Sequence, residues 1–139
     1  ESIQTALLMA TMSGVEVNLM FPCKPDHPFV YWATLSYVGE LIMAGANCYT
    51  YDNGFLHAKG LSIDGKACCY GTANMDIRSF ELNFEVNAMI FDQNIAGEME
   101  RIFREDLKCC TRITKEMYKS RSVWIRFKEQ ISRLLSPVL

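Results

Sequence analysis

The stretch HAKGLSIDGKACCYG, residues 57–71, decides which fold this chain is expected to adopt. Residues 57–63 and 66–70 carry the small and apolar side chains that suit strands, and Asp64-Gly65 between them is a strong two-residue hairpin signal. The stretch therefore predicts two antiparallel strands joined by a tight turn.

Strands and helices alternate on both sides of this hairpin. Hydrophobic spacing predicts helices over residues 2–11, 29–44, 93–108, 115–119 and 123–135, further strands over 15–22, 47–51 and 84–91, and a loop or short helix over 71–83. We therefore expect a single α/β domain over residues 1–139, a mixed β-sheet with helices packed on it in α-β-α layers.

The charge of the chain is unevenly distributed. Its 139 residues are half hydrophobic, enough for one core, and its net charge of -2 excludes a uniformly basic nucleic-acid binder. Residues 1–100 hold 4 Lys and Arg against 12 Asp and Glu, whereas residues 101–139 hold 10 against 4. Residues 112–139 are thus expected to form a basic helical segment. That segment has three interpretations: a solvated helix face, a helix on an anionic lipid surface, or a nucleic-acid contact.

The sequence contains no apolar run of the roughly 18–20 residues that a membrane-spanning helix needs. The chain opens with Glu1 and not with Met, already in a helical pattern, so we expect it to be an excised part of a longer protein. We expect this part to be soluble by itself. Its six cysteines form no C-x-x-C pair, and we expect no metal site and no cofactor.

The residues whose side chains are best suited to catalysis or ligand binding surround the hairpin. On a strand, His57 and Lys59 would project from one face about 7 Å apart, which suits an anion site because lysine neutralises phosphate oxygens. Histidine acts near neutral pH as a nucleophile or proton donor. Thr72 and Asn74 offer further donors to the same oxyanion. Glu85 is placed to accept the second imidazole N–H and to orient the ring.

This pattern resembles the signature of the phospholipase D superfamily. His57, Lys59 and Asp64 match H-x-K-x4-D, Thr72 and Asn74 match the following G-[ST]-x-N, and Glu85 matches the acidic residue that bonds the histidine. Residues 25–33, 53–59, 71–85 and 133–137 are similar to segments in the C-terminal half of bacterial cardiolipin synthases. The resemblance covers essentially the whole chain, but those enzymes carry two such motifs and this chain has one.

The resemblance implies the second half of a phosphatidyltransferase that converts two phosphatidylglycerols to cardiolipin and glycerol through a phosphohistidine. His57 would be the acid/base member, Lys59, Thr72 and Asn74 would bind the substrate phosphate, and Glu85 would orient His57. Asp64 belongs to the catalytic motif, but its place in the expected turn predicts a structural role.

The implied partners are phosphatidylglycerol, the membrane surface, and either the N-terminal half of the same enzyme or a second copy, with no nucleic acid. The implied location of the parent protein is the bacterial cytoplasmic membrane. Two alternatives remain open at this point. One is a phospholipase D-type phosphodiesterase or nuclease acting as a homodimer, and the other is an inactive lipid-surface binding module.

Overall fold

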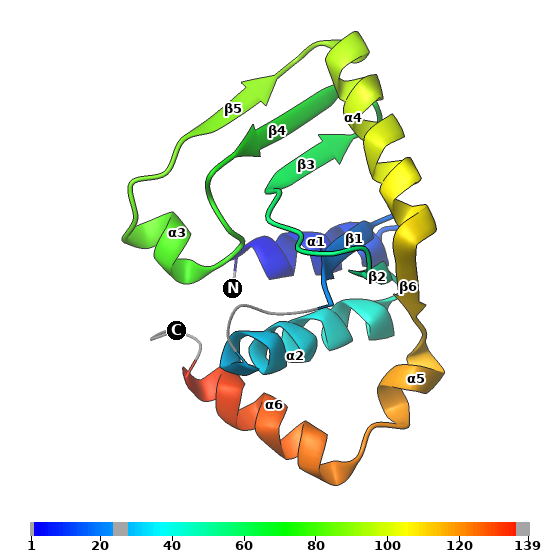
Figure 1. Cartoon of the computed structure of the whole chain (residues 1–139), viewed down its shortest axis with the longest axis vertical. Helices are drawn as coiled ribbons and strands as arrows, with labels where there is room; N and C mark the ends of the chain where they lie inside the picture. The colour runs from blue at the N-terminus through cyan, green and yellow to red at the C-terminus, as the bar shows by residue number, and fades with distance from the viewer. Residues whose placement is uncertain (1, 24–27, 136–139) are drawn as a thin grey trace. The chain divides into compact units, whose positions relative to one another are not determined.

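The computed structural model describes residues 2–23 and 28–135, which divide into two compact units (Figure 1). Unit one combines residues 1–55 with 110–139, and unit two is residues 56–109. The expected single domain over residues 1–139 stays a prediction. Each unit has its own three-stranded sheet and its own helices, and each is described by itself.

The sheet of unit one is mixed and has the strand order β1-β2-β6. Strands β1 (Asn18–Pro22) and β2 (Asn47–Tyr51) are parallel, and β6 (Cys110–Ile113) runs antiparallel to β2. A parallel pair needs a long crossover, which is supplied here by α2 (Pro28–Ala44). Two sequence segments more than fifty residues apart, β2 and β6, thereby become neighbours.

The core of unit one lies between α2 and this sheet. Gly45, at a φ of 116°, ends the helix in a conformation that favours glycine. Helix α1 (Ser2–Met12) also packs on α2. The most buried side chains share helical spacing on α2 or point inward from the strands: Leu35, Val38, Leu41, Ile42, Phe21 and Cys48.

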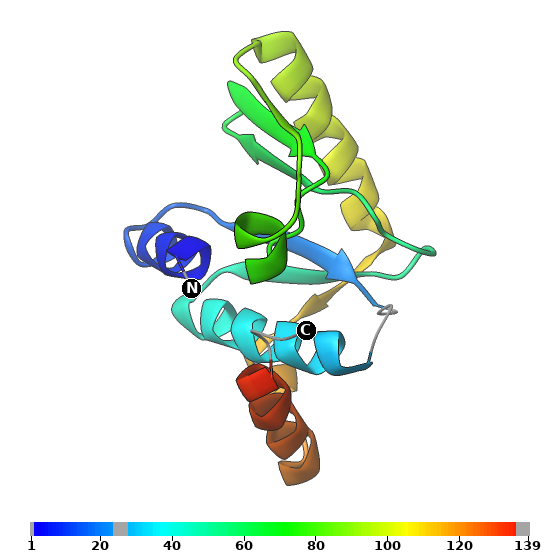
Figure 2. The same ribbon diagram turned by 90° about the vertical axis from the view of Figure 1, so that its left-hand side faces the viewer.

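The chain ends in two helices that follow β6. Thr114 caps the short α5 (Lys115–Lys119), because its hydroxyl accepts the Met117 N–H at 3.2 Å. Helix α6 (Val123–Leu135) packs across α2, as the turned view shows (Figure 2). Among the residues that the structure describes, no helix is both long and apolar enough to cross a bilayer.

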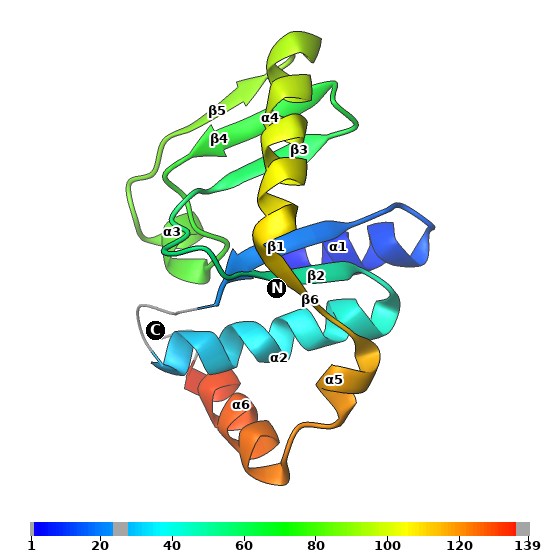
Figure 3. The same ribbon diagram turned by 45° about the vertical axis from the view of Figure 1, so that its right-hand side comes forward.

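Unit two is an antiparallel meander covered on one face by a helix. Strands β3 (Gly60–Ile63), β4 (Ala67–Gly71) and β5 (Asn87–Ile90) are neighbours in chain order, with α3 (Ile77–Glu81) in the connection between β4 and β5. Helix α4 (Gln93–Asp106) continues into a 3-10 turn, η1 (Leu107–Cys109), and lies across β3 and β4 (Figure 3).

The expected α/β class is confirmed, with helices packed on mixed and antiparallel sheets. The five predicted helices are found within a residue or two of their expected ends. The predicted strands over 15–22, 57–63 and 84–91 are longer than β1, β3 and β5, because each pairs only along part of its length. Strand β6 was not expected, since its four residues have no alternating pattern and are recognised only by pairing with β2.

Candidate active site

The register of the second sheet gathers most of the predicted site residues at one end. Gly60 pairs with Tyr70, and Gly71 pairs with Asn87, so the start of β3, the end of β4 and the start of β5 lie side by side. Two backbone hydrogen bonds extend this pairing: the Gly71 N–H donates to the Lys59 carbonyl at 3.2 Å, and the Thr72 N–H donates to the Val86 carbonyl at 3.0 Å. Residues distant in sequence therefore meet here because the strands are antiparallel.

His57 and Lys59 lie just before β3 and not within it. The prediction that they are part of the strand is wrong, because β3 begins at Gly60. That the two side chains project side by side stays a prediction. The Lys59 ammonium instead turns back to donate to the His57 carbonyl oxygen at 2.8 Å. His57 is exposed and Lys59 is half-buried.

Thr72 fastens the last residues of β4 to the approach of β5. Its hydroxyl accepts the Val86 N–H at 3.0 Å and lies 3.5 Å from the Val86 carbonyl. Asn74 follows two residues later in the exposed loop. The Thr72 hydroxyl, which is predicted to bind phosphate, thus also connects the residues after β4 to the residues before β5.

Glu85 is half-buried directly before Val86. Its carboxylate accepts a hydrogen bond from the Asn83 side-chain amide at 3.3 Å. Asn83 is not among the site residues predicted from the sequence, and the available signal was its spacing of two residues from Glu85. The hydrogen bond expected between Glu85 and His57 stays a prediction.

Asp64 lies in the turn at the other end of β3 and β4. The Lys66 N–H donates to the Ile63 carbonyl at 2.9 Å, which closes the predicted two-residue hairpin turn. Asp64 and Gly65 both have positive φ, 51° and 59°, as such a turn requires. The structure therefore does not bring Asp64 together with His57, Lys59 and Glu85.

The predicted site residues near this end of the sheet carry an imidazole, an ammonium, a hydroxyl, an amide and a carboxylate. The first four provide donors for the oxygens of an anion, and the imidazole also exchanges protons near neutral pH. Across the residues that the structure describes, no three His, Cys, Asp or Glu side chains are arranged to hold a metal ion. The arrangement suits chemistry at a phosphate in which side chains carry the charge and the proton.

Comparison with known proteins identifies the family. Residues 1–107 match the family described as "Cardiolipin synthase, PLD-like domain". The chain is 55% identical over its full length to a cardiolipin synthase of Oceanobacillus iheyensis, and 56% identical over 99% of its length to the major cardiolipin synthase ClsA of Bacillus subtilis. It covers 29% of each of these relatives. The chain belongs to the PLD-like domain family of the cardiolipin synthases.

Proposed function

We propose that the chain is the second half, with one of two motifs, of a phosphatidyltransferase that makes cardiolipin and glycerol from two molecules of phosphatidylglycerol. The observation that supports the proposal is the backbone pairing of Lys59 with Gly71 and of Thr72 with Val86, the neighbour of Glu85, at one end of the sheet of unit two, with His57 two residues before Lys59. The cardiolipin synthase names of relatives more than half identical to the chain support the same conclusion.

In the proposed reaction His57 is the acid and then the base. A histidine of a second motif attacks the phosphorus of the first phosphatidylglycerol. The new N–P bond forms as the P–O bond to glycerol breaks, and His57 protonates the departing oxygen. The hydroxyl of the second phosphatidylglycerol then attacks the phosphohistidine, transferring its proton to His57 as the N–P bond breaks. Holding both partners at one site removes most of the entropic barrier.

The neighbouring side chains have separate roles in this proposal. The Lys59 ammonium donates to the His57 carbonyl oxygen in the structure, and on substrate binding it donates to a phosphate oxygen instead. There it neutralises the negative charge that develops during the reaction. Asn74 and the Thr72 hydroxyl donate to the same phosphate. Glu85 accepts the second imidazole N–H, fixes the tautomer and stabilises the imidazolium. Asp64 has a structural role in the turn.

The second motif comes from the N-terminal half of the same enzyme or from a second copy of the chain. The chain spans less than a third of the relatives it matches, and the family resemblance implies two motifs in the complete enzyme. We propose that the complete protein acts at the cytoplasmic membrane, where its substrates are found.

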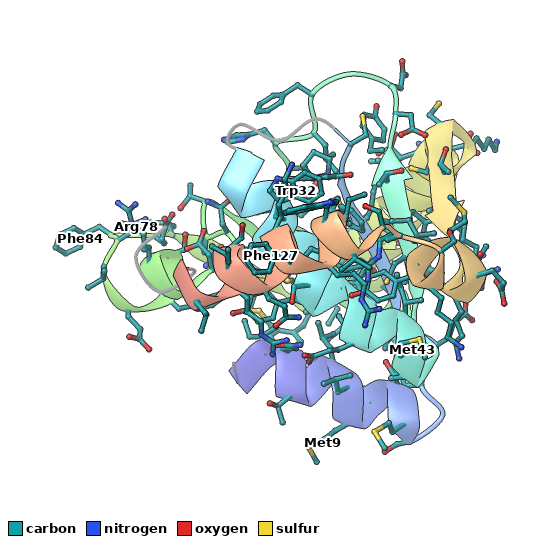
Figure 4. All side chains as sticks on the ribbon, turned by 90° about the horizontal axis from the view of Figure 1, so that it is seen from below. Met9, Trp32, Met43, Arg78, Phe84 and Phe127 are labelled. Carbon is teal, nitrogen blue, oxygen red and sulfur yellow. The ribbon has the colours of Figure 1, made fainter. Side chains whose placement is uncertain are left out.

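The surroundings of the site favour a lipid substrate over a nucleic acid. Three of the cations of α4 and η1, Arg101, Arg104 and Lys108, form ion pairs with glutamates. The segments that flank the site instead expose large apolar side chains, and Phe84 beside Glu85 projects fully into solvent (Figure 4). A nucleic acid needs unpaired cations along its backbone, whereas acyl chains need apolar surface. The exposed apolar set is Met75, Leu82, Phe84 and Val86.

The test is product analysis with phosphatidylglycerol as the sole substrate of the natural full-length protein. We expect cardiolipin and glycerol, and we expect His57→Ala to lower turnover by at least about 10²-fold, the usual cost of losing a general acid/base. Lys66→Ala, at the far end of the same hairpin, is the matched control and leaves turnover unchanged. Phosphatidic acid as the product would indicate the hydrolase alternative, and full activity of His57→Ala would refute the assigned role.

A further inference from the structure

Helix α6 has its polarity reversed relative to an ordinary surface helix. The side chains that it buries most deeply are polar: Glu129 is 2% exposed and Ser132 is 1% exposed. Five of its large apolar side chains are exposed, with Trp124 at 75% and Leu134 at 79%, whereas Ile125 is half-buried. A helix whose outer face contacts water ordinarily buries its apolar side chains and exposes its polar ones.

The outward residues form a continuous stripe. We define the α6 stripe as Trp124, Phe127, Ile131 and Leu134, whose spacing of three, four and three residues places them on one helix face. The rings of Trp124 and Phe127 are in edge contact, with centroids 6.4 Å apart, and Phe127 stands out on the ribbon of α6 (Figure 4). With Val123, these two aromatic residues line an open apolar hollow.

Ion pairs on the inner face prevent the helix from rotating the stripe inward. The buried Glu129 carboxylate pairs with the Arg121 guanidinium, which lies over the Tyr118 ring at 3.1 Å from its centroid. Arg133 pairs with Glu40 of α2. Turning α6 to bury its apolar side would break both ion pairs, so these pairs favour the outward orientation of the stripe.

Cations border the α6 stripe on both sides. At 100° per residue, Lys128 lies beyond one edge of the stripe and Arg126 beyond the other, and both are exposed. Residues 101–139 as a whole hold 10 Lys and Arg against 4 Asp and Glu. An apolar face with tryptophan at its border and flanking cations matches the boundary between lipid headgroups and acyl chains.

We propose that α6 docks on an anionic lipid bilayer, with its stripe among the upper acyl carbons and Arg126 and Lys128 at the headgroups. Charge complementarity selects this occupant, since Arg126 and Lys128 are exposed beside the stripe and each cation near an anionic membrane adds to binding. The docking rests on the proposed function only in that the substrate lipid is itself anionic.

The test measures the tryptophan fluorescence of residue 124 in the natural full-length protein bound to vesicles. The difference in emission between the protein and its Trp124→Phe variant isolates this side chain. In phosphatidylglycerol vesicles we expect blue-shifted emission that brominated acyl chains quench and aqueous iodide does not. In mixed vesicles with phosphatidylcholine, Arg126→Gln with Lys128→Gln lowers docking by roughly fivefold for each cation removed. Lys115→Gln with Lys119→Gln on α5 is the charge-matched control and leaves the quenching unchanged.

Each other outcome overturns the proposal. Emission quenched by iodide in the presence of vesicles would show that the stripe stays in water. Emission quenched by neither reagent would show that protein covers the stripe. His57→Ala should leave the lipid quenching intact, so loss of turnover and loss of docking report on the two proposals separately.

Discussion

The Thr72 hydroxyl accepts a hydrogen bond from the Val86 N–H at 3.0 Å, and this contact fixes the backbone beside Glu85 to the end of β4. Thr72, which the family pattern assigns to phosphate binding, therefore also positions the backbone next to Glu85. One hydroxyl links both sides of the proposed site.

Two substitutions at Thr72 test the contributions of its hydroxyl and of its volume separately. Thr72→Val keeps the volume but leaves the Val86 N–H without its partner, so we expect unfolding to become easier by about 1 kcal/mol and turnover to fall. Thr72→Ser keeps the hydroxyl, and should retain both stability and turnover. Chemical denaturation and product analysis on the two variants check this. Equal behaviour of the valine and serine variants would show that the hydrogen bond has no such role.

Asp64 should tolerate an amide but not a branched apolar side chain. Its φ of 51° lies in the left-handed region, which asparagine adopts readily and β-branched residues do not. We expect Asp64→Asn to retain turnover and stability, and Asp64→Val to lose about 1–2 kcal/mol of unfolding free energy.

Turnover is the decisive measurement for Asp64. Glu85→Gln serves as the comparison, since it changes a carboxylate to an amide at the site end of the same sheet and should lower turnover. Loss of activity in a fully folded Asp64→Asn protein would instead place the Asp64 carboxylate in the reaction.

The sequence predicted best those features that depend on neighbours along the chain. The Asp64-Gly65 turn is confirmed because it needs only two residues that accept positive φ. The helices at 115–119 and 123–135 are confirmed because Thr114 and the apolar spacing of α6 define them locally.

Features that depend on distant pairing were predicted less well. Strand β6 exists because β2 lies beside it, and β3 starts at Gly60 because its pairing with β4 ends there. The sequence left three interpretations of the basic segment open, because which residues α6 buries depends on its contacts with α2. Neither the burial of Glu129 nor its pairing with Arg121 is visible in the order of the residues.

The ion pair between Arg121 and Glu129 should contribute more to stability than an exposed pair. Arg121 is 16% exposed and Glu129 3% by side chain, so Arg121→Ala leaves a carboxylate in a nearly dry site. We expect a loss of about 3 kcal/mol, measured by chemical denaturation. Arg101→Ala is the matched control, because Arg101 and Glu98 are both more than half exposed, and it should cost much less than Arg121→Ala. Similar losses in the two variants would contradict the argument.

The same glutamate should give stability an unusual pH dependence. Burial raises the pKa of Glu129 above its ordinary value although Arg121 opposes the shift, so the folded protein keeps this proton at a pH where the unfolded chain has lost it. The contribution of Glu129 to the free energy of unfolding therefore falls as pH rises from the unfolded pKa through the folded one. Glu129→Gln removes that slope. Its stability relative to the natural protein should rise across this acidic window.

Glu98→Gln provides a control of opposite sign. A hydrogen bond from Arg101 lowers the pKa of the exposed Glu98 carboxyl, so its contribution to stability is present above the unfolded pKa and is lost as pH falls through the folded one. The stability of Glu98→Gln relative to the natural protein should therefore fall with rising pH. Denaturation curves collected from acidic to neutral pH on both variants compare the two slopes. Slopes of the same sign would show that burial does not govern the protonation of Glu129, because both carboxylates have an arginine partner and they differ in their exposure to water.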